Sequence, residues 1–181
     1  TPAGLHQKTA SAKAIGLVEL ATPAEVITGK VTARAVTPEG VQAKIDKEIE
    51  YVPVVLFDSS EDVKSGSHDL RLHIPAPLNG YDLVSVYGAH DVASSTDGAV
   101  AVTTIQIHNL TDTVDVLSTE LTIDEGELTS ATAAAAAVIN AFNDDVATGD
   151  IYRFDVDTVS NSDGTSVPKG LTLWLGFQNP A

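Results

Sequence analysis

The spacing of apolar and polar residues changes at about residue 51. From Tyr51 onward, apolar and polar side chains alternate with a period of two, which is typical of strands that bury one face. Seven segments show this alternation: 51–57, 69–74, 81–88, 100–108, 113–123 with a break, 150–159 and 170–177. The Asn79-Gly80 and Asp163-Gly164 pairs mark turns between them. The pattern predicts that residues 51–181 are mostly β-strands.

One segment departs from this alternation. Residues 130–142 contain five consecutive alanines, and alanine has the highest intrinsic helix propensity. We therefore expect one Ala-rich helix here, with a smooth face that can approach a sheet closely. Seven or eight short strands with one inserted helix predict a jelly-roll-like β-sandwich. The expected fold class is mainly β, with a short α-helical N-terminal segment ahead of the sandwich.

Two helix starts are visible before residue 51. Residues 22–25 (Thr-Pro-Ala-Glu) combine a hydroxyl N-cap, a proline at the first helical position and a glutamate that can reach back to the cap amide. Gly29 predicts where this helix ends. Residues 37–39 (Thr-Pro-Glu) repeat the start, and the second helix is expected to run through roughly Ile49.

The apolar residues of this second helix form a narrow stripe. Val41, Ile45 and Ile49 are spaced at i, i+4 and i+8 between charged residues. The helix could lie on its own domain, or three copies of the chain could pack their stripes together, as β-branched core residues allow. Both interpretations stay open at this point.

The net charge of −15 lies in one part of the chain. Residues 1–50 hold six basic and six acidic groups, whereas residues 51–181 hold four basic and nineteen acidic groups. An acidic field of this size repels phosphate backbones, so we expect no nucleic-acid partner.

Composition also limits the chemistry and the location of the protein. The chain has no cysteine, which excludes disulfides, zinc-thiolate sites and cysteine nucleophiles. It shows neither a signal-peptide pattern nor an apolar run long enough to span a bilayer. We expect a protein that is made in the cytoplasm and does not insert into a membrane.

Residues 14–26 (Ala-Ile-Gly-Leu-Val-Glu-Leu-Ala-Thr-Pro-Ala-Glu-Val), Gly29 and residues 34–41 (Arg-Ala-Val-Thr-Pro-Glu-Gly-Val) closely resemble a repeat of phage tail-fibre proteins. The match covers about thirty residues. It departs from the family at residues 29–32 (Gly-Lys-Val-Thr), where the family usually has Gly-Thr-Asp. Residues 144–157 and 169–171 show a weaker similarity to small phage structural proteins.

The resemblance implies a virion protein, often trimeric, that docks on the particle through its N-terminal part. Residues 1–50 would be the segment for particle attachment and trimerisation, and residues 51–181 the displayed domain at the virion surface. The chain contains no long shaft, so a short tail or head fibre that contacts the host and a capsid decoration protein both remain open. A polysaccharide depolymerase is the less favoured alternative.

Candidate catalytic and metal-binding residues are weak in this sequence. It has no Gly-x-Ser-x-Gly elbow, phosphate-binding glycine loop or His-Glu-x-x-His helix. His68 and His73 are five residues apart, which fits neither a helical zinc pair nor one face of a strand. Asp155 and Asp157 share a strand face and could bind calcium or serve a glycosidase, but a solvated face is the favoured interpretation. We expect no enzyme, metal or cofactor.

The single tryptophan lies on the last predicted strand. In residues 171–177 (Leu-Thr-Leu-Trp-Leu-Gly-Phe) the leucines and Phe177 share one face, which predicts that they face the core. Trp174 then points outward. It would lie in a subunit interface or under a second sheet, or it would stack on a sugar of the host surface glycan.

Overall fold

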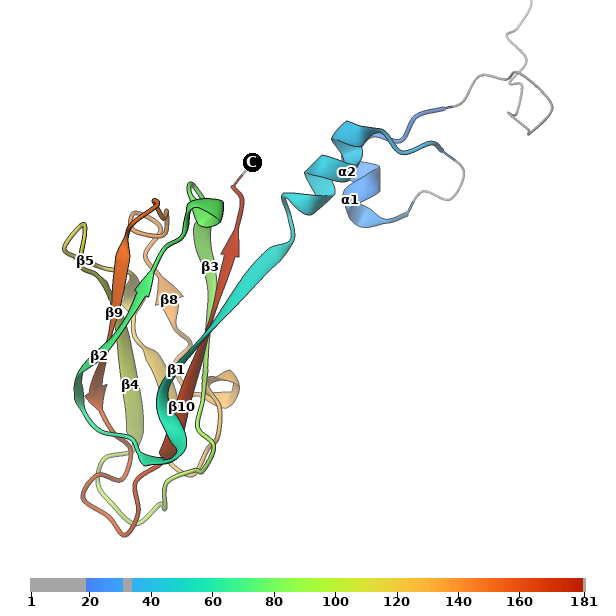
Figure 1. Ribbon diagram of the computed structural model, residues 1–181. Helices are drawn as coiled ribbons and strands as arrows, with labels where there is room; N and C mark the ends of the chain where they lie inside the picture. Colours follow the sequence, from blue (N-terminus) through green and yellow to red (C-terminus); the bar gives the residue numbers. More distant parts are fainter. Residues whose placement is uncertain (1–18, 31–33, 181) are drawn as a thin grey trace, which may run out of the picture. The chain divides into compact units, whose positions relative to one another are not determined.

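The computed structural model describes residues 19–30 and 34–180, and the chain divides into two compact units between Glu48 and Ile49. The described residues up to Glu48 form the helical unit, with helices α1 (Pro23–Thr28) and α2 (Pro38–Ile45). Ile49–Pro180 form the β unit (Figure 1). Neither helix is long and apolar enough to cross a membrane. Residues 14–18 and 31–33 of the fibre-like segment lie outside the described residues.

Helix α1 begins and ends where the sequence predicts. The Thr22 hydroxyl accepts a hydrogen bond from the Glu25 amide at 3.4 Å, and the Glu25 carboxylate accepts one from the Thr22 amide at 2.9 Å. These reciprocal bonds satisfy amides that the first turn of a helix leaves without partners. Gly29 ends the helix with φ +64°, a conformation that glycine adopts without strain. Two short N-terminal helices are therefore confirmed.

The predicted length of the second helix is wrong. Helix α2 ends at Ile45, and Ile49 is instead the first residue of strand β1. The amides of Lys47 and Glu48 bond to carbonyls three residues back, which tightens the chain before the strand begins. Ile49 pairs with Gln178, so sheet pairing outweighs the weak helical preference of a β-branched residue. Val41, Ile45 and Ile49 therefore do not form one helical stripe.

The β unit is built from antiparallel strands, as the alternating pattern predicts. The strands are β1 (Ile49–Asp62), β2 (Gly66–His73), β3 (Asp82–Ala89), β4 (Val102–Asn109), β5 (Val114–Asp115), β6 (Leu117–Thr119), β7 (Leu121–Asp124), β8 (Val138–Ile139), β9 (Ile151–Thr158) and β10 (Lys169–Gln178), and η1 (Ala76–Leu78) and η2 (Ser130–Thr132) are single 3-10 turns. One sheet has the order β1-β10-β3, and a second has the order β2-β9-β4-β5 with β7 also paired to β4; β6 and β8 form a separate two-stranded pair. Figure 1 shows these two groups of strands on opposite sides of the unit.

The inner faces of the two sheets enclose one hydrophobic core. Leu171, Leu173 and Leu175 of β10 are fully buried, as are Ile107 of β4 and Phe154 of β9. Their even spacing places alternate side chains on the inner face and leaves the intervening residues outward. Mainly β architecture with two packed antiparallel sheets is therefore confirmed.

The Ala-rich segment is not a helix, so that prediction is wrong. Residues 130–132 form a 3-10 turn, Ala133 is already extended, and Val138–Ile139 form strand β8. Side chains of β7 keep the backbone of the alanines out of a helix, because Thr122 donates to the Ala135 carbonyl and Asp124 accepts from the Ala134 amide. Alanine lowers the free energy of a helix only slightly, and the methyl groups of Ala134, Ala135 and Ala136 are exposed, so they add little burial that could favour one.

Candidate functional site: the helical unit and an outward sheet face

In the helical unit, Arg34 links the residues that precede helix α1 to those that follow it. Its guanidinium contacts the Glu19 carboxylate at 2.7 Å and also pairs with Glu25. The backbone reinforces this link, since Ala21 donates to Ala35 and Ala35 donates to Glu19. Hydrogen bonds from Thr22 lower the pKa of Glu25, and Arg34 lowers it further. The ion pairs and backbone hydrogen bonds together connect the residues before α1 with those after it.

The two helices of this unit approach each other closely at Gly40. A methyl group added at Gly40 would lie 2.8 Å from a methyl carbon of Val26, well inside normal contact distance. Gly40 also donates its amide to the Thr37 hydroxyl, which caps α2. Glycine is therefore required at this position by the packing of α2 on α1.

The helical unit leaves much of its apolar surface uncovered. Leu20, Val36, Val41 and Ile45 are exposed by 58%, 51%, 46% and 57% of their surface. Four large apolar residues exposed on so small a unit are typical of a surface that packs against another molecule.

The second surface is the outward face of the sheet formed by β1, β10 and β3. Directly paired residues of neighbouring antiparallel strands share one face of a sheet. Three adjacent cross-strand rows form the central part of this face: Tyr51, Gly176 and Ser85; Pro53, Trp174 and Tyr87; and Val55, Thr172 and Ala89. We call these nine residues the outward face. None of them carries a charge, and the next row at one end, Ile49, Gln178 and Asp82, adds one carboxylate.

Aromatic rings form the centre of the outward face. The rings of Trp174 and Tyr87 lie 5.4 Å apart, tilted by 53°, which is a favourable aromatic contact. Tyr51 is 57% exposed and Val55 is 53% exposed, whereas Trp174 is half-buried. The sequence predicts that Trp174 points outward, opposite to the buried leucines. The burial pattern along β10 agrees, since Leu173 and Leu175 are buried and Trp174 is not.

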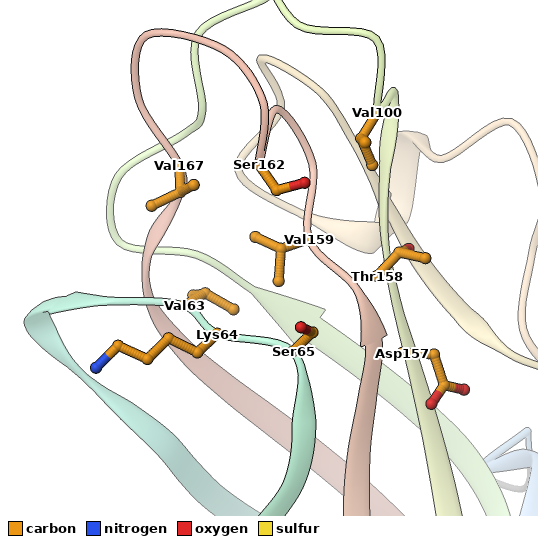
Figure 2. Close-up of a pocket in the computed structure, with 9 residues that line it drawn as sticks. All are labelled: Val63, Lys64, Ser65, Val100, Asp157, Thr158, Val159, Ser162 and Val167. Carbon is orange, nitrogen blue, oxygen red and sulfur yellow. The ribbon is translucent and has the colours of Figure 1, made fainter.

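An open groove of about 380 Å³ lies at one end of the β unit (Figure 2). Its lining residues are Val63, Lys64, Ser65, Val100, Asp157, Thr158, Val159, Ser162 and Val167. Lys64 and Asp157 lie on opposite sides of it, and Val63 and Val159 lie between them (Figure 2). The volume suits a small ligand. However, the lining contains no histidine or aromatic ring that could catalyse a reaction or stack on a sugar.

The carboxylates considered for calcium or glycosidase chemistry have other partners. Asp155 accepts three hydrogen bonds from Arg153, at 2.8, 3.1 and 2.7 Å. Burial by itself would raise the pKa of Asp155, but the bonds from Arg153 and Ser67 outweigh burial and lower it. Burial and the neighbouring Asp157 raise the pKa of Glu120. Within residues 19–30 and 34–180, no group of three His, Asp or Glu residues could hold a metal ion.

The histidines also have structural surroundings. The His68 ring packs edge-on against Phe57 at 4.9 Å, and the His108 ring lies 2.7 Å from an Asp115 oxygen. His90 is 4% exposed, and burial lowers its pKa to about 4. It is therefore neutral at pH 7. His73 is exposed at the end of β2.

Two loops at one end of the β unit are tied together by a polar network that the sequence analysis did not identify. Asp97 accepts hydrogen bonds from Ser95, Asn161 and the Thr165 amide, at 2.8, 3.0 and 2.9 Å. Asp163 accepts from the Ala99 amide at 3.0 Å. The repeated Asp-Gly pairs at 97–98 and 163–164 were the available signal. A rigid network of this kind fixes the loop shape.

Residues 58–68 and 88–98 are rich in serine, aspartate and glycine, a composition that predicts loops, but residues 58–68 are largely paired. The first part of this segment extends β1 to Asp62 and its last part begins β2 at Gly66, so only three residues connect the strands. Segment 88–98 leaves β3 at Ala89 and then joins the polar network through Asp97. The candidate functional residues therefore lie on the outward face and the helical unit instead of on long loops.

Comparison of this chain with protein-family models, curated proteins and solved structures finds no match. The function must therefore be argued from the residues themselves.

Proposed function

We propose that this chain is a structural protein of a tailed-phage virion: a short trimeric surface fibre without enzymatic activity. The helical unit attaches to the particle and the β unit is displayed. The proposal rests on the resemblance of residues 14–41 to the tail-fibre repeat.

One observation carries the proposal. The residues that carry the resemblance are those that hold the helical unit together. Thr22 and Thr37 cap the two helices, Arg34 pairs with two glutamates, and Gly40 lets the helices approach. A motif in which several recurring residues have a structural task is more than a chance match of composition, and it favours a module that serves the same purpose in several proteins.

The strand order supports a jelly-roll β unit. The strands β1, β2, β3 and β4 fall alternately in the three-stranded and the larger sheet, and β9 and β10 lie in the middle of the larger and the smaller sheet, respectively. This alternation between two sheets is the arrangement that a jelly roll has. Domains of this architecture present rigid surfaces, which suits a displayed virion protein.

Exposed apolar surface supports trimerisation. Val41 and Ile45 remain open on α2, and Ile49 is 37% exposed at the start of β1. The outward face with Trp174 provides a second uncharged surface. Contact of this face with host glycan is a second possible role, and stacking of Trp174 and Tyr87 on a sugar would be its physical basis.

Immunogold labelling of purified virions with antibody against this chain tests the proposal. Labelled tails indicate a tail fibre, and labelled shells indicate a head fibre or decoration protein. Unlabelled particles would contradict a virion role altogether. The attachment role is tested with Arg34→Ala, which we expect to reduce incorporation into particles, while Lys64→Ala at the groove leaves it unchanged. If both variants are incorporated normally, the helical unit is not the anchor.

A further inference from the structure

We propose that the outward face of the β1-β10-β3 sheet is where β units of neighbouring copies of this chain contact one another. The inference rests on the proposed trimer and names the surface that the β units contribute to it. Tyr51, Trp174 and Tyr87 would form its centre.

Charge singles out this face. Residues 51–181 carry nineteen acidic and four basic groups, yet the nine residues of the outward face include none, and Asp82 lies only in the row at its end. Interface centres are depleted of charge and enriched in tyrosine and tryptophan in the same way. Exposed strand positions normally carry polar and charged groups, so the outward face is not an ordinary solvated sheet surface.

The same charges indicate which partner fits. Two copies that each carry a net charge of −15 repel each other. Contact through an uncharged face is opposed least, because it brings no like charges together and removes no charge from water. A basic partner would instead be drawn to the acidic surfaces elsewhere on the unit. A second copy offers a matching uncharged aromatic face, so the charge pattern favours self-association over a charged partner.

The geometry of β1 directs the contact to the face instead of the edge. Among the described strands, β1 is an edge strand that pairs only with β10. Pro53 lies in its middle and has no amide hydrogen, and the pairing is irregular between Val55 and Phe57. Both features hinder strand pairing with another chain. The copies can still contact one another through the side chains of the outward face. Such an assembly can close around a symmetry axis, whereas strand pairing at the edge would form an open-ended sheet.

The surface of the outward face is also shaped for contact. Gly176 has no side chain, and Ile49 and Tyr51 lean over it, with atoms 2.8 and 3.0 Å from where a β-carbon would stand. Tyr51 therefore lies over Gly176, in the row next to Trp174 and Tyr87. Tyrosine and tryptophan residues at the centre of a face supply most of the binding energy in many protein interfaces.

Trp174 is the only tryptophan, so its fluorescence reports on this face alone. We would measure acrylamide quenching of the full-length protein over a dilution series, with sedimentation velocity on the same samples. Association should protect Trp174, and quenching should increase as the trimer dissociates. Raising the salt concentration should strengthen association, because it screens repulsion between acidic copies. A salt-weakened trimer would indicate an interface of ion pairs and contradict the proposal.

Substitutions complete the test. Trp174→Ala should weaken association roughly 30-fold, the effect of losing a central aromatic residue. Val55→Asp should abolish it, whereas Leu70→Asp, at a 39% exposed position on the other sheet, should not. Circular dichroism checks that each variant is folded. Tyr51→Phe offers a milder second variant at the face.

The outcomes separate this inference from the proposed function. A trimer that persists in Val55→Asp and leaves Trp174 open to quenching would overturn the assignment of the face and leave the trimer standing. A protein that sediments as a monomer at every concentration would overturn both. A shift of Trp174 emission on addition of neutral oligosaccharides of glucose, galactose or N-acetylglucosamine, in a trimer whose Trp174 is open to quencher, would assign the face to glycan instead.

Discussion

The helical unit and the β unit are stabilised by different interactions. The β unit has a continuous core of 22 buried residues shared by its two sheets. Among the described residues of the helical unit, only Ala21 and Gly40 are buried, and caps and ion pairs hold the unit together. Burial of apolar surface is the larger source of stability, whereas exposed ion pairs and caps each contribute about 1 kcal/mol or less.

This difference fits the roles that we propose for the two units in a fibre. The β unit has enough core to keep its shape without a partner, as the proposed displayed domain must. The helical unit combines weak internal interactions with exposed Leu20, Val36, Val41 and Ile45. Binding to another surface stabilises a marginal unit of this kind by mass action. Attachment and folding of the helical unit are therefore expected to be coupled.

The largest effect is expected in the core of the β unit. Phe154 is fully buried on β9, whereas Phe142 is 92% exposed. Phe154→Ala should lower the free energy of unfolding by about 3–5 kcal/mol through lost burial and a cavity. The matched Phe142→Ala should change it by less than about 0.5 kcal/mol. Urea denaturation measures both, and comparable losses from the two substitutions would contradict the assignment of the core.

Alternation along the strands made most of the β unit predictable. The buried leucines of β10 and the outward Trp174 follow directly from a period of two. Cap chemistry likewise identified both helix starts, because a hydroxyl, a proline and a glutamate act on amides only a few residues away. Local interactions of this kind can be read from one stretch of sequence.

Features that depend on distant contacts could not be predicted in this way. The alanines of residues 133–137 are held extended by Thr122 and Asp124 of a neighbouring strand. Ile49 leaves the helical pattern because β10, more than a hundred residues later, offers it a strand partner. The uncharged outward face becomes visible only when β1, β10 and β3 lie side by side. Candidate sites were therefore predicted less well than strands.

In the helical unit, the closest contact between helices should be the most sensitive point. Gly40→Ala adds a methyl group against Val26, and overpacking of this kind lowers stability by about 1–3 kcal/mol, more than the gain of up to about 1 kcal/mol in helix propensity. Hydrogen exchange of α1 and α2 should speed up while the urea midpoint of the β unit stays unchanged. The double variant Gly40→Ala/Val26→Ala should recover protection, because it restores space. Slower exchange in the single variant would contradict the close packing.

Loss of a helix cap should have a smaller effect. Thr22→Ala removes the hydroxyl that accepts from the Glu25 amide and should reduce the stability of the helical unit by about 1 kcal/mol. Thr22→Ser keeps the hydroxyl and serves as the control. Hydrogen exchange of residues 24–26 reports the loss. Equal exchange in the alanine and serine variants would show that the capping bond contributes nothing.

The smallest predicted effect separates the two units by the sign of their response to pH. The pKa of Glu25 in the helical unit is lowered, chiefly by hydrogen bonds from Thr22, so its contribution to stability is present above its ordinary pKa of 4.5 and is lost as the pH falls through its folded value. The pKa of Glu120 in the β unit is raised by burial and by Asp157. Charged Glu120 destabilises the folded β unit. The free energy of unfolding of the β unit therefore rises as the pH falls from above this raised pKa to 4.5, the ordinary pKa of glutamate.

Matched amide substitutions isolate these two groups. Glu120→Gln should raise the urea midpoint of the β unit at pH 7 and change it little at pH 4, where wild-type Glu120 is largely protonated. Glu25→Gln should speed hydrogen exchange in α1 at pH 7, with exchange rates corrected for their intrinsic dependence on pH, and should have less effect below pH 4.5. The two substitutions should change stability in opposite directions at pH 7, because hydrogen-bond donors stabilise charged Glu25, whereas Asp157 destabilises charged Glu120. If both substitutions destabilise their units at pH 7, Glu120 has a stabilising partner and its pKa is not raised.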